Sequence, residues 1–394
     1  MRMKLAVLAG VVAAVCMVDA QDYGARARAI HKQSPLVDGH NDYPWALRDI
    51  DPGRDFGKAD ISKPAPNLMT DIERLRKGGV GGQFWSVYTP STMMGKEATR
   101  VTMDEIDTVH RMTTRWPEMF HLALTADDVE RVFKNGRIAS MIGMEGGHSI
   151  DNSLAALRMF YALGARYMTL THSTNLAWAD SATDKPEHGG LTKFGEEVVR
   201  EMNRLGMLVD LSHVSPDTME DALRVTEAPV IFSHSSARAL CNVPRDVPDN
   251  ILQLVAKNGG VVMVTFVPGF ISQEVADFNA KPEAERKGLT APRATLSQVA
   301  DHIDHIRKVA GIDHVGLGGD FDGITDVVQG LEDVSKYPDL TAELLKRGYK
   351  DDDVKKVIGG NVLRVMRGAE KVAASLQKSR QPSTATIEQL DAKQ

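Results

Sequence analysis

The sequence predicts an α/β protein built as a single (β/α)8 barrel of the TIM type. Short runs of apolar and β-branched residues recur eight times, and longer amphipathic stretches separate them. This alternation of strand and helix indicates a parallel sheet, and eight repeats are typical of a closed barrel. An open, doubly wound sheet is the main alternative. No Gly-x-Gly-x-x-Gly turn follows the first strand, which disfavours a dinucleotide-binding version of that fold.

The predicted strands are short and are bounded by glycine, proline or polar residues. They cover residues 35–38, 81–88, 137–144, 166–171, 207–211, 229–233, 260–266 and 314–318. Helix patterns occupy residues 69–77, 101–112, 152–163, 193–204, 216–224, 250–257 and 296–310. Two helix starts are marked by their first residues. Thr125 precedes two aspartates, and Ser215 precedes a proline at the first helical position.

The first 20 residues are predicted to be a secretory signal rather than part of the fold. Arg2 and Lys4 precede a mostly apolar run at 5–18 that is too short to span a bilayer, and a cleavage point follows before Gln21. We therefore expect a periplasmic or secreted protein. Residues 21–374 are expected to form the barrel, and residues 375–394 a polar, flexible tail with no membrane anchor.

Composition argues against a nucleic-acid partner and against an internal disulfide. The formal net charge is −6, and acidic and basic residues are mixed along the chain, so no basic stripe indicates nucleic-acid binding. Of the two cysteines, Cys16 falls in the predicted signal and only Cys241 remains in the mature chain. The sequence therefore predicts no internal disulfide, even though export is expected.

Side chains that bind metals follow most of the predicted strands. Because the carboxyl ends of barrel strands lie at the face where barrel enzymes place their active sites, we expect these groups to converge. A single histidine at a strand end is more typical of a structural hydrogen bond, but several at one face favour a metal centre. The candidates are His40, Asp42, Glu145, His172, His213, His234 and Asp320.

Imidazole and carboxylate donors without a thiolate suit zinc, and the candidates divide into two sets. His40 and Asp42 lie two residues apart on an extended backbone, so both side chains turn the same way and can hold one ion. His213 and His234 come from adjacent strands and can hold a second, with Glu145 as a bridge. Two bridged ions about 3.5–4 Å apart can share a hydroxide, which suits the hydrolysis of an unactivated amide.

Three further residues have chemical roles in this prediction. Asp320, after the last strand, is the best candidate to move a proton from water to the leaving amine. His172 is not needed as a ligand and can hydrogen-bond the oxyanion of a tetrahedral intermediate. Arg245 lies in a proline-stiffened loop at 241–249, where its guanidinium can hold a substrate carboxylate.

Other polar and aromatic residues receive structural interpretations. Asp38 either orients His40 or caps the turn, and the sequence favours neither. Asp322 is interpreted as a turn residue. Tyr88 and the tryptophans near predicted strands either line the pocket or pack in the core. Surface or structural roles are preferred for His110, His121, His148, His302, His305 and His314.

Ordered motifs between residues 35 and 367 resemble the membrane (renal) dipeptidase family. The motifs are Val37-Asp-Gly-His-Asn-Asp42, Gly81-Gly-Gln-Phe-Trp-Ser86, Gly143-Met-Glu-Gly-Gly-His148, Thr169-Leu-Thr-His172, Leu211-Ser-His213, Phe232-Ser-His-Ser-Ser236, Gly318-Gly-Asp-Phe-Asp-Gly323 and the stretch 330–339. The resemblance implies a (β/α)8 barrel that cleaves dipeptides, often with a D-residue at the C-terminal position. Some members open β-lactam rings, and many are homodimers.

The resemblance also implies a role for each candidate residue. It places His40, Asp42 and Glu145 on one zinc ion, and Glu145, His213 and His234 on the other. It makes His172 and Arg245 substrate-binding residues and Asp320 the acid/base residue.

The sequence departs from the mammalian members of this family at several positions. It has no C-terminal glycolipid signal, and Ser91 and Thr174 replace both cysteines of one disulfide. Gln273 stands where the partner of Cys241 would fall, and Val267 replaces a tyrosine near the substrate carboxylate. We therefore expect carboxylate recognition to depend more heavily on the arginine of the 241–249 loop.

Two rival functions remain open at this point. A related binuclear amidohydrolase would act on β-lactams, lactones or N-acyl amino acids, and the metal ligands alone do not separate it from a dipeptidase. A non-catalytic periplasmic binding protein belongs to a different class. The complete ligand set together with Asp320 disfavours it, because a binding module has no need of an acid/base residue.

Overall fold

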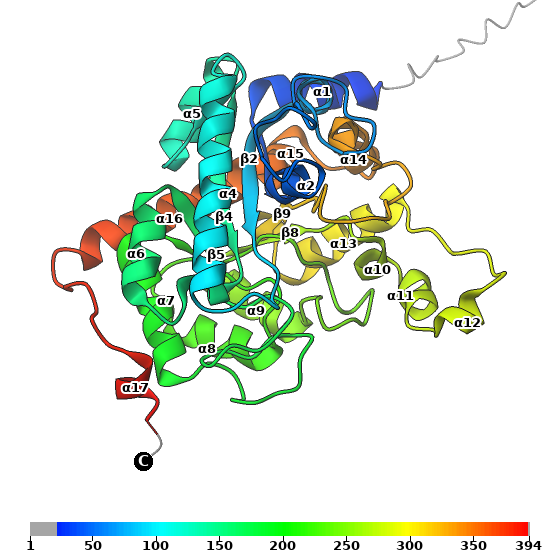
Figure 1. Ribbon diagram of the computed structural model, residues 1–394. Coiled ribbons are helices and arrows are strands. Elements are labelled where there is room, and N and C mark those ends of the chain that lie inside the picture. Colours follow the sequence, from blue (N-terminus) through cyan, green and yellow to red (C-terminus); the bar gives the residue numbers. More distant parts are fainter. Residues whose placement is uncertain (1–21, 393–394) are drawn as a thin grey trace, which may run out of the picture.

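The computed structural model describes residues 22–392 (Figure 1). The predicted signal peptide and its cleavage point lie outside the described residues. Within this part of the chain, no helix combines the length and the apolar composition that a membrane span requires.

Eight parallel strands close into a barrel, as predicted. Their order is β2-β1-β9-β8-β7-β6-β5-β4, and pairing of β4 with β2 closes the ring. Each corresponds to a predicted strand, because strands buried on both faces appear in a sequence as continuous apolar runs. Their bounds are β1 Leu36–Asn41, β2 Val80–Tyr88, β4 Ile138–Glu145, β5 Ala165–Thr169, β6 Leu208–Asp210, β7 Ile231–Phe232, β8 Val261–Val264 and β9 Val315–Leu317.

A ninth strand was not predicted. β3 (Phe120–Leu122) pairs with residues 138–140 of β4, and β5 takes the same edge of β4 from residue 142 onward. It is three residues long, which is too short for a clear periodicity. The barrel itself is unchanged by it.

Helices surround the barrel, and each predicted helix overlaps one of them. The main helices are α1 Tyr23–Gln33, α2 Tyr43–Ile50, α3 Ile72–Gly78, α4 Lys96–Arg115, α5 Ala126–Lys134, α6 Leu154–Ala162, α7 Lys193–Leu205, α8 Pro216–Val225, α9 Asp249–Asn258, α13 Leu296–Val309, α14 Tyr337–Lys346 and α16 Asn361–Leu376. Shorter ones are α10 Pro268–Ile271, α11 Gln273–Asn279, α12 Glu283–Arg286, α15 Asp351–Lys355 and α17 Ile387–Leu390. Thr125 caps α5 with a reciprocal capping box, and Ser215 caps α8 with Pro216 following, which confirms both predicted starts.

Two glycines let three strands approach closely at the carboxyl end of the barrel. A Cβ atom on Gly39 would lie 2.5 Å from the carbonyl oxygen of Ser233, and one on Gly318 would lie 1.8 Å from the same oxygen. Both distances are shorter than any real contact of a Cβ atom, so these positions accept only glycine without a backbone shift. The residues that follow β1, β7 and β9 are thereby brought together.

The described part of the polar C-terminal segment lies along α6 and α7 (Figure 1), and the flexibility expected for residues 375–394 stays a prediction. The Asp391 carboxylate accepts hydrogen bonds from Thr192 Oγ1 at 2.6 Å and Phe194 N at 3.1 Å, at the start of α7. Arg158 donates to the carbonyl of Ser383 at 2.8 Å. A negative charge at a helix N-terminus is favourable, which explains the position of this carboxylate.

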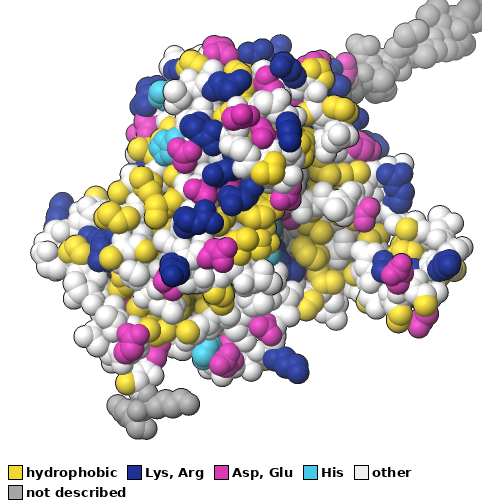
Figure 2. Space-filling view, viewed as in Figure 1, with side chains coloured by type: hydrophobic (Ala, Val, Ile, Leu, Met, Phe, Trp, Pro, Cys, Tyr) yellow, Lys and Arg dark blue, Asp and Glu magenta, His cyan; other side chains and the backbone are white. Residues whose placement is uncertain are grey.

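Figure 2 shows acidic and basic side chains intermingled over the visible face, as the mixed charge pattern of the sequence predicts.

Candidate metal centre

The predicted site residues converge at the carboxyl ends of the barrel strands. They surround a cleft of about 510 Å³ whose walls include every one of them except the fully buried His40. The lining residues are Asp42, Trp45, Asp49, Tyr88, Glu145, His172, His213, His234, Arg245, Val267, Phe270, Asp320, Asp322, Gly323, Ile324 and Thr325.

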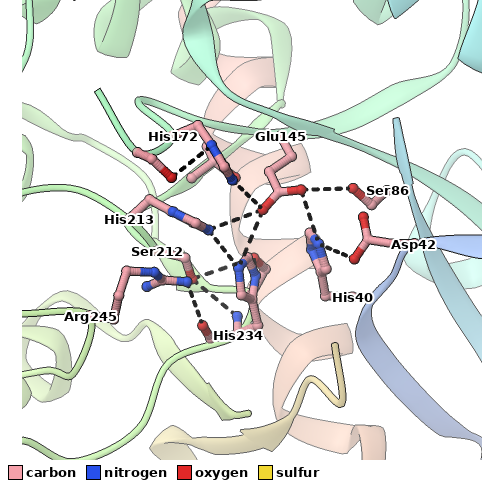
Figure 3. Close-up of polar contacts among 12 residues, drawn as sticks. His40, Asp42, Ser86, Glu145, His172, Ser212, His213, His234 and Arg245 are labelled. Atoms are coloured by element: carbon pink, nitrogen blue, oxygen red, sulfur yellow. Dashed lines mark hydrogen bonds and ion pairs between the residues drawn. The ribbon is translucent and has the colours of Figure 1, made fainter. Parts of the chain in front are cut away.

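The carboxylate of Glu145, at the end of β4, lies between His40 and the other histidines of the cleft (Figure 3). Its Oε2 atom is 3.4 Å from His40 Nε2 and accepts a hydrogen bond from Ser86 at 3.1 Å. Its Oε1 atom is 3.0 Å from His213 Nε2 and 3.5 Å from His234 Nε2. The two oxygens of one carboxylate therefore face two different sets of nitrogen donors.

The donor atoms form three overlapping groups, each within 4.8 Å. The groups are His40, Glu145 and His234; Glu145, His172 and His213; and His40, Asp42 and Asp320.

These side chains fit a bound cation. The Nε2 atoms of His213 and His234 face one another at 2.9 Å. His40 Nε2 and Asp42 Oδ1 are buried and have no hydrogen-bond partner among the described residues. Burial alone would lower the pKa of His40, but neighbouring groups, with Asp42 and Glu145 among them, raise it well above its usual value. The local potential thus favours a positive charge at this point.

The pKa directions of His213, His234 and Glu145 also suit metal binding, which requires neutral imidazoles and ionised carboxylates. Burial lowers the pKa of His213 and of His234 well below the usual value, so both rings are neutral. Burial alone would raise the pKa of the Glu145 carboxyl, but the surrounding imidazoles hold it well below its usual range. Asp320 differs, because burial raises its pKa well above the usual range and the carboxylates of Asp42 and Glu145 add to this.

Three residues of the cleft wall have left-handed backbone conformations. The φ angles are +69° at His213, +62° at Asp320 and +66° at Asp322. Such conformations are costly for residues other than glycine and persist only where the surroundings enforce them. Here the amide of Ala182 donates to the carbonyl of His213 at 2.7 Å, and the amide of Asp320 donates to the carbonyl of His40 at 3.1 Å. The backbone is therefore held so that the side chains of His213 and Asp320 enter the cleft.

Asp38 and Asp322, which were not predicted to bind metal, both hold turns in place. Asp38 accepts hydrogen bonds from Gly319 N at 2.8 Å and Gln83 Nε2 at 2.9 Å, so it ties β1 to the turn after β9. The same carboxylate also accepts from His40 N at 3.4 Å, so it caps the turn and contacts His40 through the backbone. Asp322 accepts from Met69 N at 2.6 Å and so holds the loop before α3, which agrees with its interpretation as a turn residue.

The ring of His40 is instead contacted by Tyr167, which the sequence analysis did not single out. The hydroxyl of this tyrosine lies 2.8 Å from His40 Nδ1. A tyrosine inside a predicted strand is most simply interpreted as core, and no local motif marks it.

The predicted substrate-binding residues His172 and Arg245 both line the cleft. His172 Nε2 is 3.6 Å from Glu145 Oε1, and the ring of Tyr88 packs 5.1 Å from that of His172. Arg245 donates to Ser235 Oγ and to the carbonyl of His234, both at 3.3 Å. Tyr88 lines the cleft, whereas the other two aromatic candidates, Trp85 and Trp178, are core residues.

The loop that carries Arg245 is fixed by hydrogen bonds rather than by a disulfide. Gln273 Oε1 accepts from Asn242 N at 2.6 Å, and the free thiol of Cys241 donates to the carbonyl of Gly269 at 3.4 Å. Phe270 packs beside the guanidinium, with its ring centre 5.3 Å from Arg245 Cζ.

Five of the six histidines with surface or structural interpretations make hydrogen bonds within the protein, and two of these five are buried. His148 Nε2 contacts the carbonyl of Thr89 at 2.9 Å, and His302 Nδ1 accepts from Ala237 N at 3.0 Å.

Comparison with known proteins agrees with this geometry. The sequence model of the membrane dipeptidase family (peptidase family M19) matches residues 24–380. The probable dipeptidase PvdM from Pseudomonas aeruginosa is 26% identical, with a TM-score of 0.78 over 90% of this chain and 100% of that one. A metallopeptidase described as dipeptidase AC is 27% identical, with a TM-score of 0.75 over 85% and 98% of the two chains.

A third similar structure carries a ligand. A metallopeptidase from Rhodobacter sphaeroides, bound to a phosphinate mimic of the dipeptide L-Ala-D-Ala, is 25% identical, with a TM-score of 0.74 over 85% and 99% of the two chains. The resemblance found in the sequence motifs is confirmed over nearly the whole described chain, and the protein belongs to the membrane dipeptidase family of metallopeptidases.

Proposed function

We propose that this protein is a dipeptidase that works with two zinc ions. His40, Asp42 and Glu145 would hold one ion, and Glu145, His213 and His234 the other. The observation that carries the proposal is the position of Glu145, whose Oε2 faces His40 at 3.4 Å and whose Oε1 faces His213 and His234 at 3.0 and 3.5 Å. A donor set of imidazoles and carboxylates supports zinc. The ions would polarise the scissile carbonyl and activate water for attack.

In this proposal Asp320 moves the proton. Its carboxylate lies within 4.8 Å of the donor atoms of His40 and Asp42, and burial raises its pKa, which makes it a stronger proton acceptor than an exposed aspartate. It would take the proton from the attacking water and deliver it to the departing amine. His172, on the other side of Glu145, is neutral because burial lowers its pKa, and it would donate a hydrogen bond to the developing oxyanion.

Arg245 would recognise the C-terminal carboxylate of the dipeptide. Its guanidinium lines the cleft, and the apolar side chains of Val267 and Phe270 line the adjacent wall. Acceptance of a C-terminal D-residue is supported by the relative that was solved with an L-Ala-D-Ala mimic.

Replacing Arg245 with alanine is expected to raise KM for dipeptides by about 10- to 100-fold with a smaller change in kcat, because a charge-assisted pair of hydrogen bonds is lost. Steady-state kinetics with a free dipeptide and with its C-terminal amide measures the effect. The amide lacks the carboxylate, so the variant and the parent should treat it alike. An equal loss for both substrates would show that Arg245 does not bind the carboxylate.

We further propose that the protein is exported and acts as a homodimer in the periplasm or outside the cell. Export is supported by the basic and then apolar pattern of residues 1–20, and the dimer by the family resemblance. N-terminal sequencing of the exported protein tests cleavage before Gln21, and light scattering tests the dimer.

A further inference from the structure

Tyr167 reaches across the inside of the barrel. It lies on β5, in register with Gly143 of β4, and its hydroxyl contacts β1. A Cβ atom on Gly143 would lie 2.0 Å from Tyr167 Cζ, so the glycine leaves the space that the ring occupies. The ring of Phe84 packs 5.1 Å away. Four strands therefore combine to place one buried hydroxyl.

This hydroxyl makes two contacts with the same short piece of β1. It donates to the carbonyl of Gly39 at 3.2 Å and lies 2.8 Å from Nδ1 of the next residue, His40. Both contacts are fully buried. The backbone before His40 and the His40 ring are thus held by a single atom.

The two contacts together select one tautomer of His40. A carbonyl only accepts hydrogen bonds, so the hydroxyl proton is directed to Gly39. The hydroxyl oxygen must then accept from Nδ1–H, so Nδ1 keeps its proton and Nε2 is the nitrogen that is free to bind a metal. Nε2 lies 3.2 Å from Asp42 and 3.4 Å from Glu145, the two carboxylates that would share this metal.

We propose that Tyr167 is a positioning residue for the metal that His40 and Asp42 would hold, and that it fixes the His40 ring with Nε2 directed toward that metal. This inference rests on the proposed function, because it concerns one of the two proposed ions. The position of Tyr167 also depends on glycine at residue 143, because any side chain there would overlap the tyrosine ring.

The second proposed ion does not depend on this tyrosine. His234 Nδ1 lies 2.8 Å from Ser233 Oγ, and His213 Nδ1 is buried without a hydrogen-bond partner among the described residues. Loss of the Tyr167 hydroxyl should therefore weaken one metal and leave the other in place, whereas general damage to the barrel would weaken both.

The test is calorimetric titration of the metal-free full chain with Zn²⁺. In Tyr167→Phe, one of two binding events should weaken by about 10- to 100-fold, the usual cost of losing a partner behind a metal ligand, and the other should keep its affinity. Tyr349→Phe is the matched control. Tyr349 is also buried, and its hydroxyl donates at 2.7 Å to Asp304 in the outer helical layer. This control should bind both ions as the parent does.

A second measurement separates positioning from packing. In a His40→Ala background, Tyr167→Phe should cause no further change in the affinity of the remaining ion. A persistent loss in that background, equal weakening of both events, or unchanged affinities in Tyr167→Phe would each overturn the inference. If the parent protein itself bound no zinc, the proposed function would fail, and the two failures are thereby distinguishable.

Discussion

The Glu145→Gln variant is expected to lose dipeptide hydrolysis by about 1,000-fold or more, because metal ions supply several kcal/mol of transition-state stabilisation. Glutamine keeps one oxygen but places an amide group where the second oxygen stood. Histidine nitrogens lie 3.0–3.5 Å from both carboxylate oxygens, so each oxygen lies beside a proposed metal position. The amide NH2 group of glutamine cannot bind a metal ion at either position. At least one ion should therefore be released.

Metal content after dialysis and kcat/KM measured on the same sample test this result. Glu105→Gln is a suitable control, since Glu105 is equally buried but pairs with Arg48 at 2.8 Å on the outer helices. The control should retain its metal. Full metal content and ordinary turnover in Glu145→Gln would mean that the carboxylate does not bridge the ions.

Replacing Asp320 with asparagine should separate metal binding from catalysis. Asparagine keeps the shape of the side chain but neither accepts nor returns a proton. We expect kcat to fall by about 100- to 10,000-fold, the usual contribution of a positioned general acid or base, while both ions remain bound. KM should change little, because the substrate carboxylate is recognised elsewhere in the cleft.

The kinetics and metal content of Asp320→Asn are compared with those of a control variant, Asp322→Asn. Asp322 lies two residues further along the chain with the same left-handed backbone, but its carboxylate is engaged by Met69 N. This control should retain most of its turnover. Turnover in Asp320→Asn equal to that of the parent would remove Asp320 from the mechanism.

The barrel was predictable because its strands are buried on both faces. Such strands form apolar runs that stand out from the amphipathic helices between them. β3 was missed because it is three residues long and lies outside the closed ring. The C-terminal segment was predicted to be flexible from its polar composition. Its contacts join residues far apart in the chain, such as Asp391 and Thr192, and composition carries no information about them.

The candidate ligands were predictable for a different reason. The fold places the carboxyl end of every strand at one face of the barrel. The position of a histidine or carboxylate in the sequence, directly after a strand, therefore predicts that it lies at this face. Tyr167 does not follow a strand, so its position in the sequence does not indicate a role in the site. It sits inside a strand, and its partner His40 is 127 residues away. Only the closed barrel shows that the Tyr167 ring occupies the space beside Gly143 and reaches His40.

Metal analysis of the purified parent protein, combined with a dipeptide assay, tests the central claim most directly. We predict two zinc-class ions per chain, loss of hydrolysis when a chelator removes them, and recovery when zinc is restored. Fewer than two ions, with no gain of activity on adding zinc, would contradict the binuclear centre on which this account depends.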